Sequence, residues 1–548
     1  MYLLSAGSRG ESEIWIVDMH EDLRNKIKSA LVFLLFLLLC CLNLTPVQAD
    51  DGPHRVKAIE VEYTERYWWM VRDSDNHVEC ELAIEHQDIP TPEEIYYQCG
   101  FDVYENRMEE IACEQENPDQ LSSCSGFYFQ HVGEGQKTRV IDIEIPPATI
   151  QIVPPRCTSL SDESCEAIPR LQFTSTEPLP NEQIILVEGM LDGYPFFCQG
   201  DSCEVQLKET DQLGVEIEFK ADSSFGDSTI QHSGRIRVIQ VDEGWAVDFL
   251  ITTDESAPSQ GCSQIWLAFP PPGDPPAWLA NPDQAELLET NLPLHFLAGK
   301  LIQLGYVDAS GCDYYGLTED GYATQCGLEL ARDDVFYWQN NFDPFIIEAA
   351  QESGIPSRLI KRIISQESQF WPGIIEHSYF EHGLGQLTFN GVDATLMWNE
   401  DFYDAFCPLV LLESACERGY AHLGKLEQEM LQNVYLNNMA IDLPSEPGGF
   451  DQEQIRTSLA YLGEAVIGNC RQVGKMVENL TGDSAGLATG FEDLWRFTLA
   501  NYHAGPGCLS EALGEVHARE KPLTWVNISM ELEEVCPHAV DYVIEVTK

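Results

Sequence analysis

The cysteines place the strongest constraint on how this chain can fold. The sequence contains 18 of them, and two, Cys40 and Cys41, fall in an apolar run near the N-terminus. Sixteen remain beyond that run, and no two of these are spaced as Cys-x-x-Cys. An even number of cysteines in an exported chain predicts disulfide bonds, and the spacing argues against a zinc or redox site.

Disulfide connectivity does not follow from sequence, but cysteines that lie close together along the chain are the first candidates. Three such pairs are Cys198 with Cys203, Cys312 with Cys326, and Cys407 with Cys416. We also expect four cysteines to cross-link the N-terminal part of the chain: Cys80, Cys99, Cys113 and Cys124.

The N-terminus has the features of an export signal. Arg24, Lys26 and Lys28 precede the apolar residues 31–42, and Ala49 ends a small-residue cleavage site. This pattern predicts a secretory signal peptide at residues 1–49, and hence a secreted or cell-envelope protein. The apolar run is short for a membrane span, which needs about 20 residues. An uncleaved anchor is the alternative, and it is the only way in which we expect this chain to meet a membrane.

The charge balance excludes one class of partner. Lys and Arg total 31 against 90 Asp and Glu, a formal net charge of −59. Such acidity argues against a nucleic-acid partner and disfavours anionic membrane surfaces. No motif indicates a cofactor or a metal ion.

The segment that follows the signal looks β-rich. Residues 50–145 combine the four cross-linking cysteines with a partly alternating strand pattern at 56–63. The run Tyr67-Trp68-Trp69-Met70 could stack on sugars, but aromatic residues in such a run more often belong to a core. We therefore expect a cysteine-linked β domain here.

Residues 146–255 predict a β-sandwich, because short alternating runs recur with turn residues between them. The candidate strands are 149–153, 170–174, 183–188, 215–220, 235–241 and 245–251, the last two joined as a hairpin through 242–244. The stretch 192–198, Asp-Gly-Tyr-Pro-Phe-Phe-Cys, resembles bacterial immunoglobulin-like repeats. That resemblance implies an immunoglobulin-like module that serves as a spacer or in adhesion.

The sequence changes character after the sandwich. The Pro-rich run 270–276 predicts a stiff linker, and we interpret residues 256–339 as this linker followed by a helical connector, with a helix at 287–304. Helical patterns continue from 342–350 to residue 548. The expected fold is multidomain: N-terminal β-rich modules, then a mostly α-helical domain at 340–548.

A single carboxylate stands at the end of one apolar helix face. The helix is predicted at residues 356–369, and its apolar positions are Leu359, Ile360, Ile363 and Ile364. Glu367 follows Ile363 by four residues and so shares its face. Desolvation and the negative end of the helix dipole are both expected to raise the pKa of this carboxyl. An acid that stays neutral near pH 7 can protonate a leaving oxygen in glycosidic cleavage. A buried Glu held by a backbone or Arg partner is the structural alternative.

Further motifs follow Glu367 in a fixed order. They read Glu367-Ser368-x-Phe370-x-Pro372, Gly383-Leu384-x-Gln386-Leu387, Tyr502-x-Ala504-Gly505-x-Gly507 and Tyr542-Val543-x-x-Val546. Together they resemble the soluble lytic transglycosylase family. The resemblance implies a lysozyme-like helical domain over residues 340–548, with an insertion at about residues 390–490.

The resemblance also implies a reaction. Glu367 would be the sole acid and base: it would protonate the oxygen that joins N-acetylmuramic acid to N-acetylglucosamine in peptidoglycan. It would then take the proton of the muramoyl 6-hydroxyl, which closes on C1 to leave a 1,6-anhydro sugar. Ser368, Gln386, Tyr502 and Tyr542 would contact the glycan strand. Gly383 and Gly385 would let the backbone approach it closely.

The chain departs from the family pattern in several places. His503 stands where the family usually has Asn, and Phe380-Glu381-His382 replaces its Gly-Ala. The insertion carries Cys407, Cys416 and Cys470, and it could extend the cleft or cover it.

Two other functions therefore stay open. A hydrolytic muramidase or chitin-type glycosidase would use Glu376 or Glu381 to position a water, although both also fit a solvated acidic loop. A non-catalytic envelope protein would bind glycan and mediate adhesion, a possibility raised by the departures at His382 and His503.

Overall fold

A computed structural model describes residues 55–116, 124, 126–159, 164–241, 244–252, 261–373, 382–444 and 448–548. The chain divides into two compact units, Met1–Ile145 and Pro146–Lys548. The predicted signal peptide at residues 1–49 lies outside the described residues.

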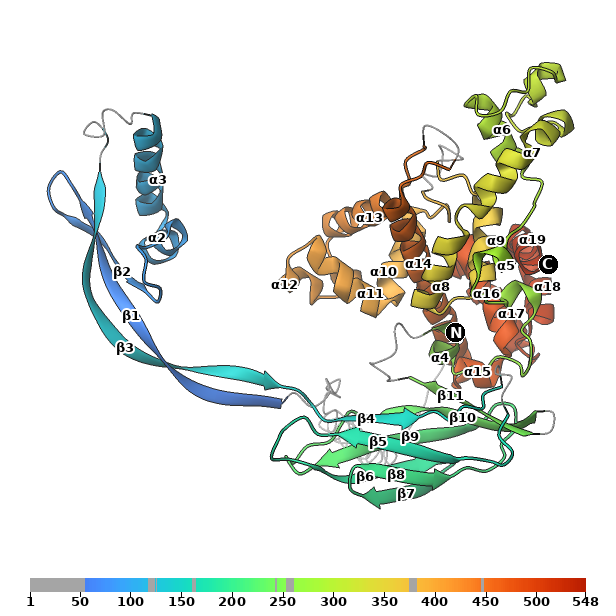
Figure 1. The fold of residues 1–548 in the computed structure, drawn as a ribbon, viewed down its shortest axis with the longest axis horizontal. Coiled ribbons are helices and arrows are strands. Elements are labelled where there is room, and N and C mark those ends of the chain that lie inside the picture. Colours follow the sequence, from blue (N-terminus) through green and yellow to red (C-terminus); the bar gives the residue numbers. More distant parts are fainter. Residues whose placement is uncertain are drawn as a thin grey trace, which may run out of the picture. The chain divides into compact units, whose positions relative to one another are not determined.

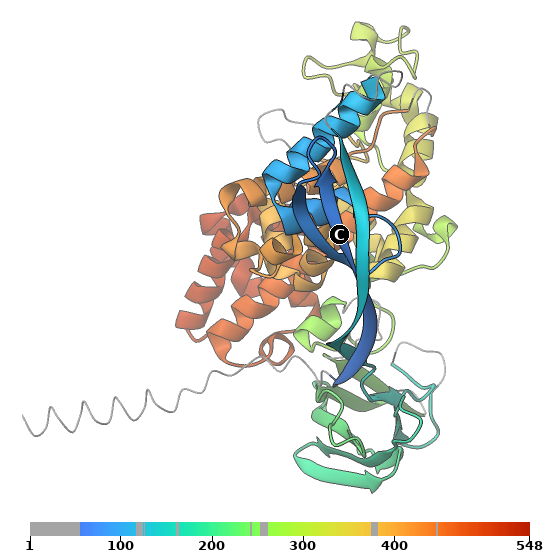
Figure 2. The same ribbon diagram turned by 90° about the vertical axis from the view of Figure 1, so that its left-hand side faces the viewer.

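The first unit is built on an antiparallel sheet with the strand order β2-β1-β3. Its elements are β1 (Arg55–Arg72), β2 (Val78–Ile84), α2 (Pro92–Cys99), α3 (Phe101–Glu116) and β3 (Phe127–Ile145). The two helices lie beside the sheet (Figures 1 and 2). Met70 is fully buried and Trp68 packs against the same small core, so this part of the aromatic run serves packing. The disulfides Cys80–Cys99 and Cys113–Cys124 cross-link the unit.

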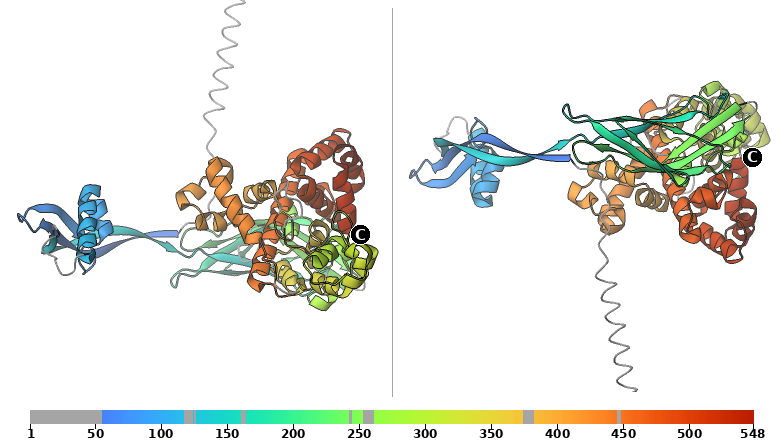
Figure 3. Two further views of the ribbon diagram at one scale, coloured as in Figure 1. Left: turned by 90° about the horizontal axis from the view of Figure 1, so that it is seen from above. Right: turned by 90° about the horizontal axis from the view of Figure 1, so that it is seen from below.

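The second unit begins with a β-sandwich. One sheet has the order β11-β10-β9-β6-β7 and the other β4-β5-β8; the view from below in Figure 3 shows the strands side by side. The strands are β4 (Thr149–Val153), β5 (Arg170–Thr176), β6 (Ile184–Leu191), β7 (Tyr194–Gln199), β8 (Ser202–Gln206), β9 (Val215–Ser223), β10 (His232–Val241) and β11 (Gly244–Ile251). Six of them correspond to the predicted strands, and β10 and β11 pair antiparallel as expected.

Sequence reasoning missed the strands β7 and β8. β6 and β7 form a hairpin whose turn residues, Asp192 and Gly193, both have positive φ. A two-residue Asp-Gly turn of this kind is a strong hairpin signal, and it was available in the sequence.

The rest of the second unit is mostly helical. Its helices are α4 (Cys262–Trp266), η2 (Ala277–Leu279), α5 (Ala285–Leu288), α6 (His295–Gln303), η3 (Asp313–Gly316), α7 (Gln325–Asn340), α8 (Asp343–Ser353), α9 (Ser357–Glu367), α10 (Phe389–Trp398), α11 (Glu400–Phe406), η4 (Cys407–Leu409), α12 (Glu413–Cys416), η5 (Tyr420–His422), α13 (Lys425–Met439), α14 (Gln452–Thr481), α15 (Ala485–Ala488), α16 (Phe491–Ala504), α17 (Pro506–Ala518), α18 (Trp525–Val535) and α19 (Pro537–Thr547). The 30-residue α14 packs against α8, α10, α13 and α16.

One hydrophobic core serves this whole helical region, and it extends into the predicted connector. It reaches from Cys262 to Val546 and includes Trp278 and Leu279 of η2. The helix predicted at 287–304 is divided into α5 and α6, because Pro293 disfavours helical backbone in the residue before it.

All 16 cysteines beyond the apolar N-terminal run form disulfides. The three predicted local pairs, Cys198–Cys203, Cys312–Cys326 and Cys407–Cys416, are confirmed. The others are Cys80–Cys99, Cys113–Cys124, Cys157–Cys165, Cys262–Cys470 and Cys508–Cys536. So many disulfides indicate an oxidising, extracytoplasmic environment. Among the described residues, no helix combines the length and apolarity that crossing a membrane requires.

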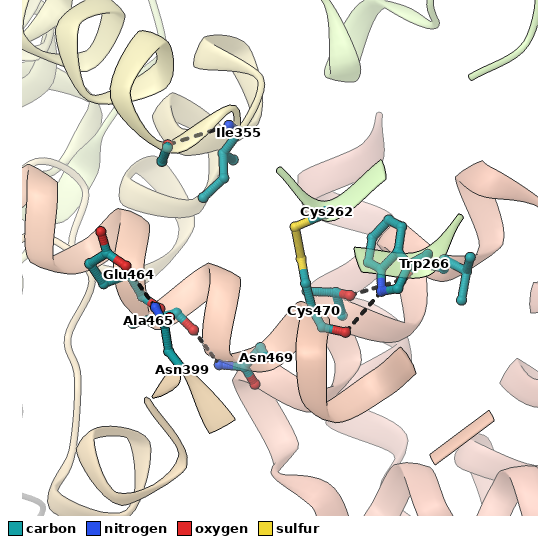
Figure 4. The surroundings of a disulfide bond; sticks show 11 residues. Cys262, Trp266, Ile355, Asn399, Glu464, Ala465, Asn469 and Cys470 are labelled. Atoms are coloured by element: carbon teal, nitrogen blue, oxygen red, sulfur yellow. Dashed lines mark hydrogen bonds between the residues drawn. A yellow bond between two sulfur atoms is a disulfide. The ribbon is translucent and has the colours of Figure 1, made fainter. Parts of the chain in front are cut away.

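The disulfide Cys262–Cys470 joins residues 208 positions apart. It attaches α4, which follows the sandwich, to the middle of α14, where the Trp266 indole donates to the Cys470 carbonyl at 2.8 Å (Figure 4). The bond therefore ties the start of the helical region to its central helix.

Removal of this long-range bond should cost the most stability among the disulfides. We expect the double variant Cys262→Ser/Cys470→Ser to lose about 2–5 kcal/mol of unfolding free energy, because the unfolded chain regains a long loop. The matched control, Cys198→Ser/Cys203→Ser, opens a separation of only 5 residues and should lose about 2 kcal/mol. Calorimetry on both variants measures this order, and an equal loss would contradict it.

Candidate functional site

Helix α9 carries Glu367 as its last residue. The burial of the apolar face of α9 determines where this residue lies. Leu359, Ile360, Ile363 and Ile364 are all 0% exposed. Glu367 itself is half-buried, as its place on this face predicts. Arg362, on another side of α9, donates to the Val546 carbonyl at 3.2 Å, which attaches α19 to α9.

A buried ion pair also holds α9 in place, and sequence reasoning missed it. The Lys361 Nζ lies 2.6 Å from the Asp343 Oδ1 of α8, and both side chains are almost completely buried. Lys361 also donates to the Leu288 carbonyl and to the Asn340 Oδ1. Burial raises the pKa of Asp343 to about 6 against the lowering effect of Lys361, and burial lowers the pKa of Lys361 against the opposite effect of Asp343. The available signal was a lysine inside an otherwise apolar helix face.

The chain leaves α9 through an unusual backbone path. Gln369 and Phe370 have φ values of 49° and 62°, in the left-handed region that non-glycine residues rarely adopt. The Trp338 indole donates to the Phe370 carbonyl at 2.9 Å and holds this path. Ser368 is fully buried, and its hydroxyl donates to the Ile364 carbonyl at 3.1 Å. Its predicted contact with a glycan stays a prediction.

The loop at residues 383–388 brings Gln386 into the interior. Gly383 and Gln386 have φ values of 69° and 46°, and the Gln386 amide nitrogen donates to the Gly383 carbonyl at 2.7 Å. Gln386 is 6% exposed, and its side-chain oxygen accepts no hydrogen bond within the part of the chain that the structure describes. A buried acceptor of this kind is costly to leave unsatisfied, so it can serve a donor on a bound molecule.

Two tyrosines from distant parts of the chain approach Glu367. Tyr502, on α16, donates its hydroxyl to the Gly385 carbonyl at 2.7 Å. Burial first, and then the charge of the Glu367 carboxylate, raise the pKa of Tyr502. The same two causes raise the pKa of Tyr542, on α19, which is 4% exposed. The acid, the 383–388 loop and two neutral phenols therefore meet in one place.

His503 and His382, the two histidines at which the chain departs from the family pattern, have different surroundings. His503 stacks on Tyr542, with ring centroids 4.2 Å apart and planes 7° apart. Its pKa is lowered by burial and further by His538. Burial also lowers the pKa of His382, whose backbone pairs with Leu387. Glu376 and Glu381, the candidates for positioning a water, lie outside the described residues.

The predicted insertion contributes to the same core instead of forming a separate body. Tyr403 and Tyr435 of this segment are buried there, and Cys470 pairs with a cysteine from outside it. No group of three or more metal-ligating side chains occurs within the described ranges.

Comparisons of the chain with protein-family models, with curated proteins and with solved structures give no match. The resemblance to soluble lytic transglycosylases therefore depends on the ordered motifs of the sequence alone.

The Lys361–Asp343 pair gives a direct test of how α9 is held. Asp343→Asn should lower the unfolding free energy by about 3–5 kcal/mol, because it leaves the Lys361 charge buried without its partner. In Asp343→Asn/Lys361→Met the charge is gone, so a large part of the loss should be recovered. Denaturant unfolding of both variants decides this, and an equal loss in both would contradict the assignment.

Gly385 tests the packing between the loop and Tyr502. A Cβ at this position would lie 2.8 Å from the Tyr502 hydroxyl oxygen and 2.5 Å from a Leu462 methyl group. Gly385→Ala should therefore displace Tyr502 and destabilise the protein by about 1–3 kcal/mol. Gly507→Ala is the matched control, because a Cβ there meets nothing within 4 Å. The melting temperatures of the two variants should differ clearly, and similar values would contradict the close packing.

Proposed function

We propose that the helical region is a lytic transglycosylase domain that cleaves the glycan strands of peptidoglycan. The observation that supports this most is the meeting of Glu367 with Tyr502 and Tyr542, which come from three separate motifs. The Tyr502–Gly385 hydrogen bond adds the fourth motif to the same place. In this proposal the helical region is lysozyme-like.

Glu367 acts first as an acid. Its proton passes to the oxygen between N-acetylmuramic acid and N-acetylglucosamine, and the bond from C1 to that oxygen breaks. The resulting carboxylate then accepts the proton of the muramoyl 6-hydroxyl, and that oxygen bonds to C1. The acid is regenerated, and no water is consumed. One carboxylate suffices, unlike in glycosidases that use two, because the same group supplies and recovers the proton.

The neighbouring side chains favour this chemistry. The raised pKa values of Tyr502 and Tyr542 keep both phenols protonated, so they add no negative charge beside Glu367. The Tyr502 hydroxyl donates to the Gly385 carbonyl, and the Tyr542 hydroxyl can donate to a bound molecule. The Gln386 side-chain oxygen, which accepts no hydrogen bond from the described residues, can accept one from a sugar hydroxyl or amide. Closely packed protein around the acid strengthens these interactions relative to water.

The N-terminal region fits a supporting role in an exported enzyme. We interpret the β-sandwich as an immunoglobulin-like spacer, and the eight disulfides suit a protein that works in the cell envelope or outside the cell. The signal peptide at residues 1–49 would direct this export.

The Glu367→Gln variant tests the proposal. It removes the transferable proton with little change in shape, so the release of fragments from purified peptidoglycan should fall about 10²- to 10⁴-fold. Glu511→Gln, at an exposed carboxylate on α17, is the matched control and should leave the rate unchanged.

Mass spectrometry of the products separates the alternatives. Wild-type protein should leave 1,6-anhydromuramoyl ends. Reducing ends without anhydro sugars would replace the proposal with a hydrolase. Equal activity of wild type and Glu367→Gln would reject catalysis by Glu367, and glycan binding without cleavage would identify a non-catalytic envelope protein.

A further inference from the structure

Tyr542 lies on a helix that three other helices hold in place. α19, which carries it, packs against α16, α18 and α9, and the disulfide Cys508–Cys536 anchors the chain directly before α19. The Tyr542 side chain is 4% exposed, and its hydroxyl is near enough to Glu367 for the carboxylate to raise the pKa of the phenol. Packing therefore fixes the helix and buries the ring, and one further contact bears on the orientation of the ring.

His503 supplies that contact. It follows Tyr502 in the last turn of α16, so the two side chains point in different directions around the helix. Tyr502 reaches the Gly385 carbonyl, while the His503 imidazole lies flat on the Tyr542 ring at 4.2 Å. Consecutive residues of α16 thus contact the loop and α19.

The two rings are stacked almost parallel, so the contact restrains the Tyr542 side chain. The planes of the two rings deviate by only 7°, and stacked aromatic pairs contribute about 0.5–1.5 kcal/mol beyond their buried area. Rotation of the Tyr542 side chain about its Cα–Cβ bond would break the stack and would also move the hydroxyl relative to Glu367. His503 lies at the surface, with one face of its ring covered by Tyr542, so it can be replaced without opening a cavity in the core.

We propose that His503 is a positioning residue for the reaction at Glu367: its ring holds the Tyr542 ring in the orientation that directs the phenol hydroxyl toward the acid. This inference rests on the proposed function for its effect on rate, while the contact itself can be tested without any activity. His503 touches Tyr542 and acts only through it.

Three variants separate positioning from general stability. His503→Ala removes the stack, His503→Phe keeps a flat ring at the same place, and His517→Ala changes an exposed histidine of α17 as the matched control. Peptidoglycan cleavage is measured as kcat and KM. In parallel, the tyrosines are labelled with ¹³C, and the NMR signal of Tyr542 is assigned by its loss in Tyr542→Phe.

We expect His503→Ala to shift the Tyr542 signal and to lower kcat about 10- to 100-fold, with a smaller effect on KM. His503→Phe should restore most of the signal position and most of kcat. His517→Ala should match the wild type in both.

An unchanged Tyr542 signal in His503→Ala overturns the proposal, whether or not the rate falls. A shifted signal with an unchanged rate overturns it as well. If the wild type cleaves no peptidoglycan, the proposed function fails, while a shift that His503→Phe reverses still establishes the contact between His503 and Tyr542.

Discussion

The buried pair of Lys361 and Asp343 is the interaction on which the helical region most depends. Two opposite charges can remain inside a core only if they stay together and find further polar partners, here the Leu288 carbonyl and the Asn340 side chain. Few arrangements of α9 against α8 satisfy these contacts at once. We infer that the pair selects one orientation of α9, and with it the place where Glu367 meets the rest of the site.

Much of the fold could be predicted from local sequence patterns, because alternation and short cysteine spacing themselves determine strands and local disulfides. Six sandwich strands followed from alternation, and three disulfides followed from short spacing. β7, the edge strand of its sheet, was missed because its sequence YPFFCQ is an almost continuous apolar run without the apolar–polar alternation of the other strands. Residues 256–339 were predicted as a Pro-rich linker and a helical connector. Trp278 and Leu279 of this segment pack into the helical core, and composition alone does not reveal such packing.

The candidate site also has one part that the sequence predicts and another that it does not. The place of Glu367 on the buried face of its helix could be predicted from a spacing of four residues. The partners of the acid could be named only through the order of the motifs, because Tyr502 and Tyr542 reach it through the packing of α16 on α19 and of α19 on α9. The stack of His503 on Tyr542 depends on the angle between two helices, and no spacing along the chain encodes it.

The spread of disulfide spans carries a consequence for how the protein matures. Seven of the bonds link cysteines at most 28 positions apart, whereas Cys262 must find Cys470 across 208. Near neighbours meet readily in an unfolded chain, but a distant pair pays a greater entropic cost to meet. Both distant cysteines are buried, so oxidation there would record that α4 and α14 have already docked. Formation of this one bond would thus report a completed helical core, and a thiol-trapping time course would find it among the last to close.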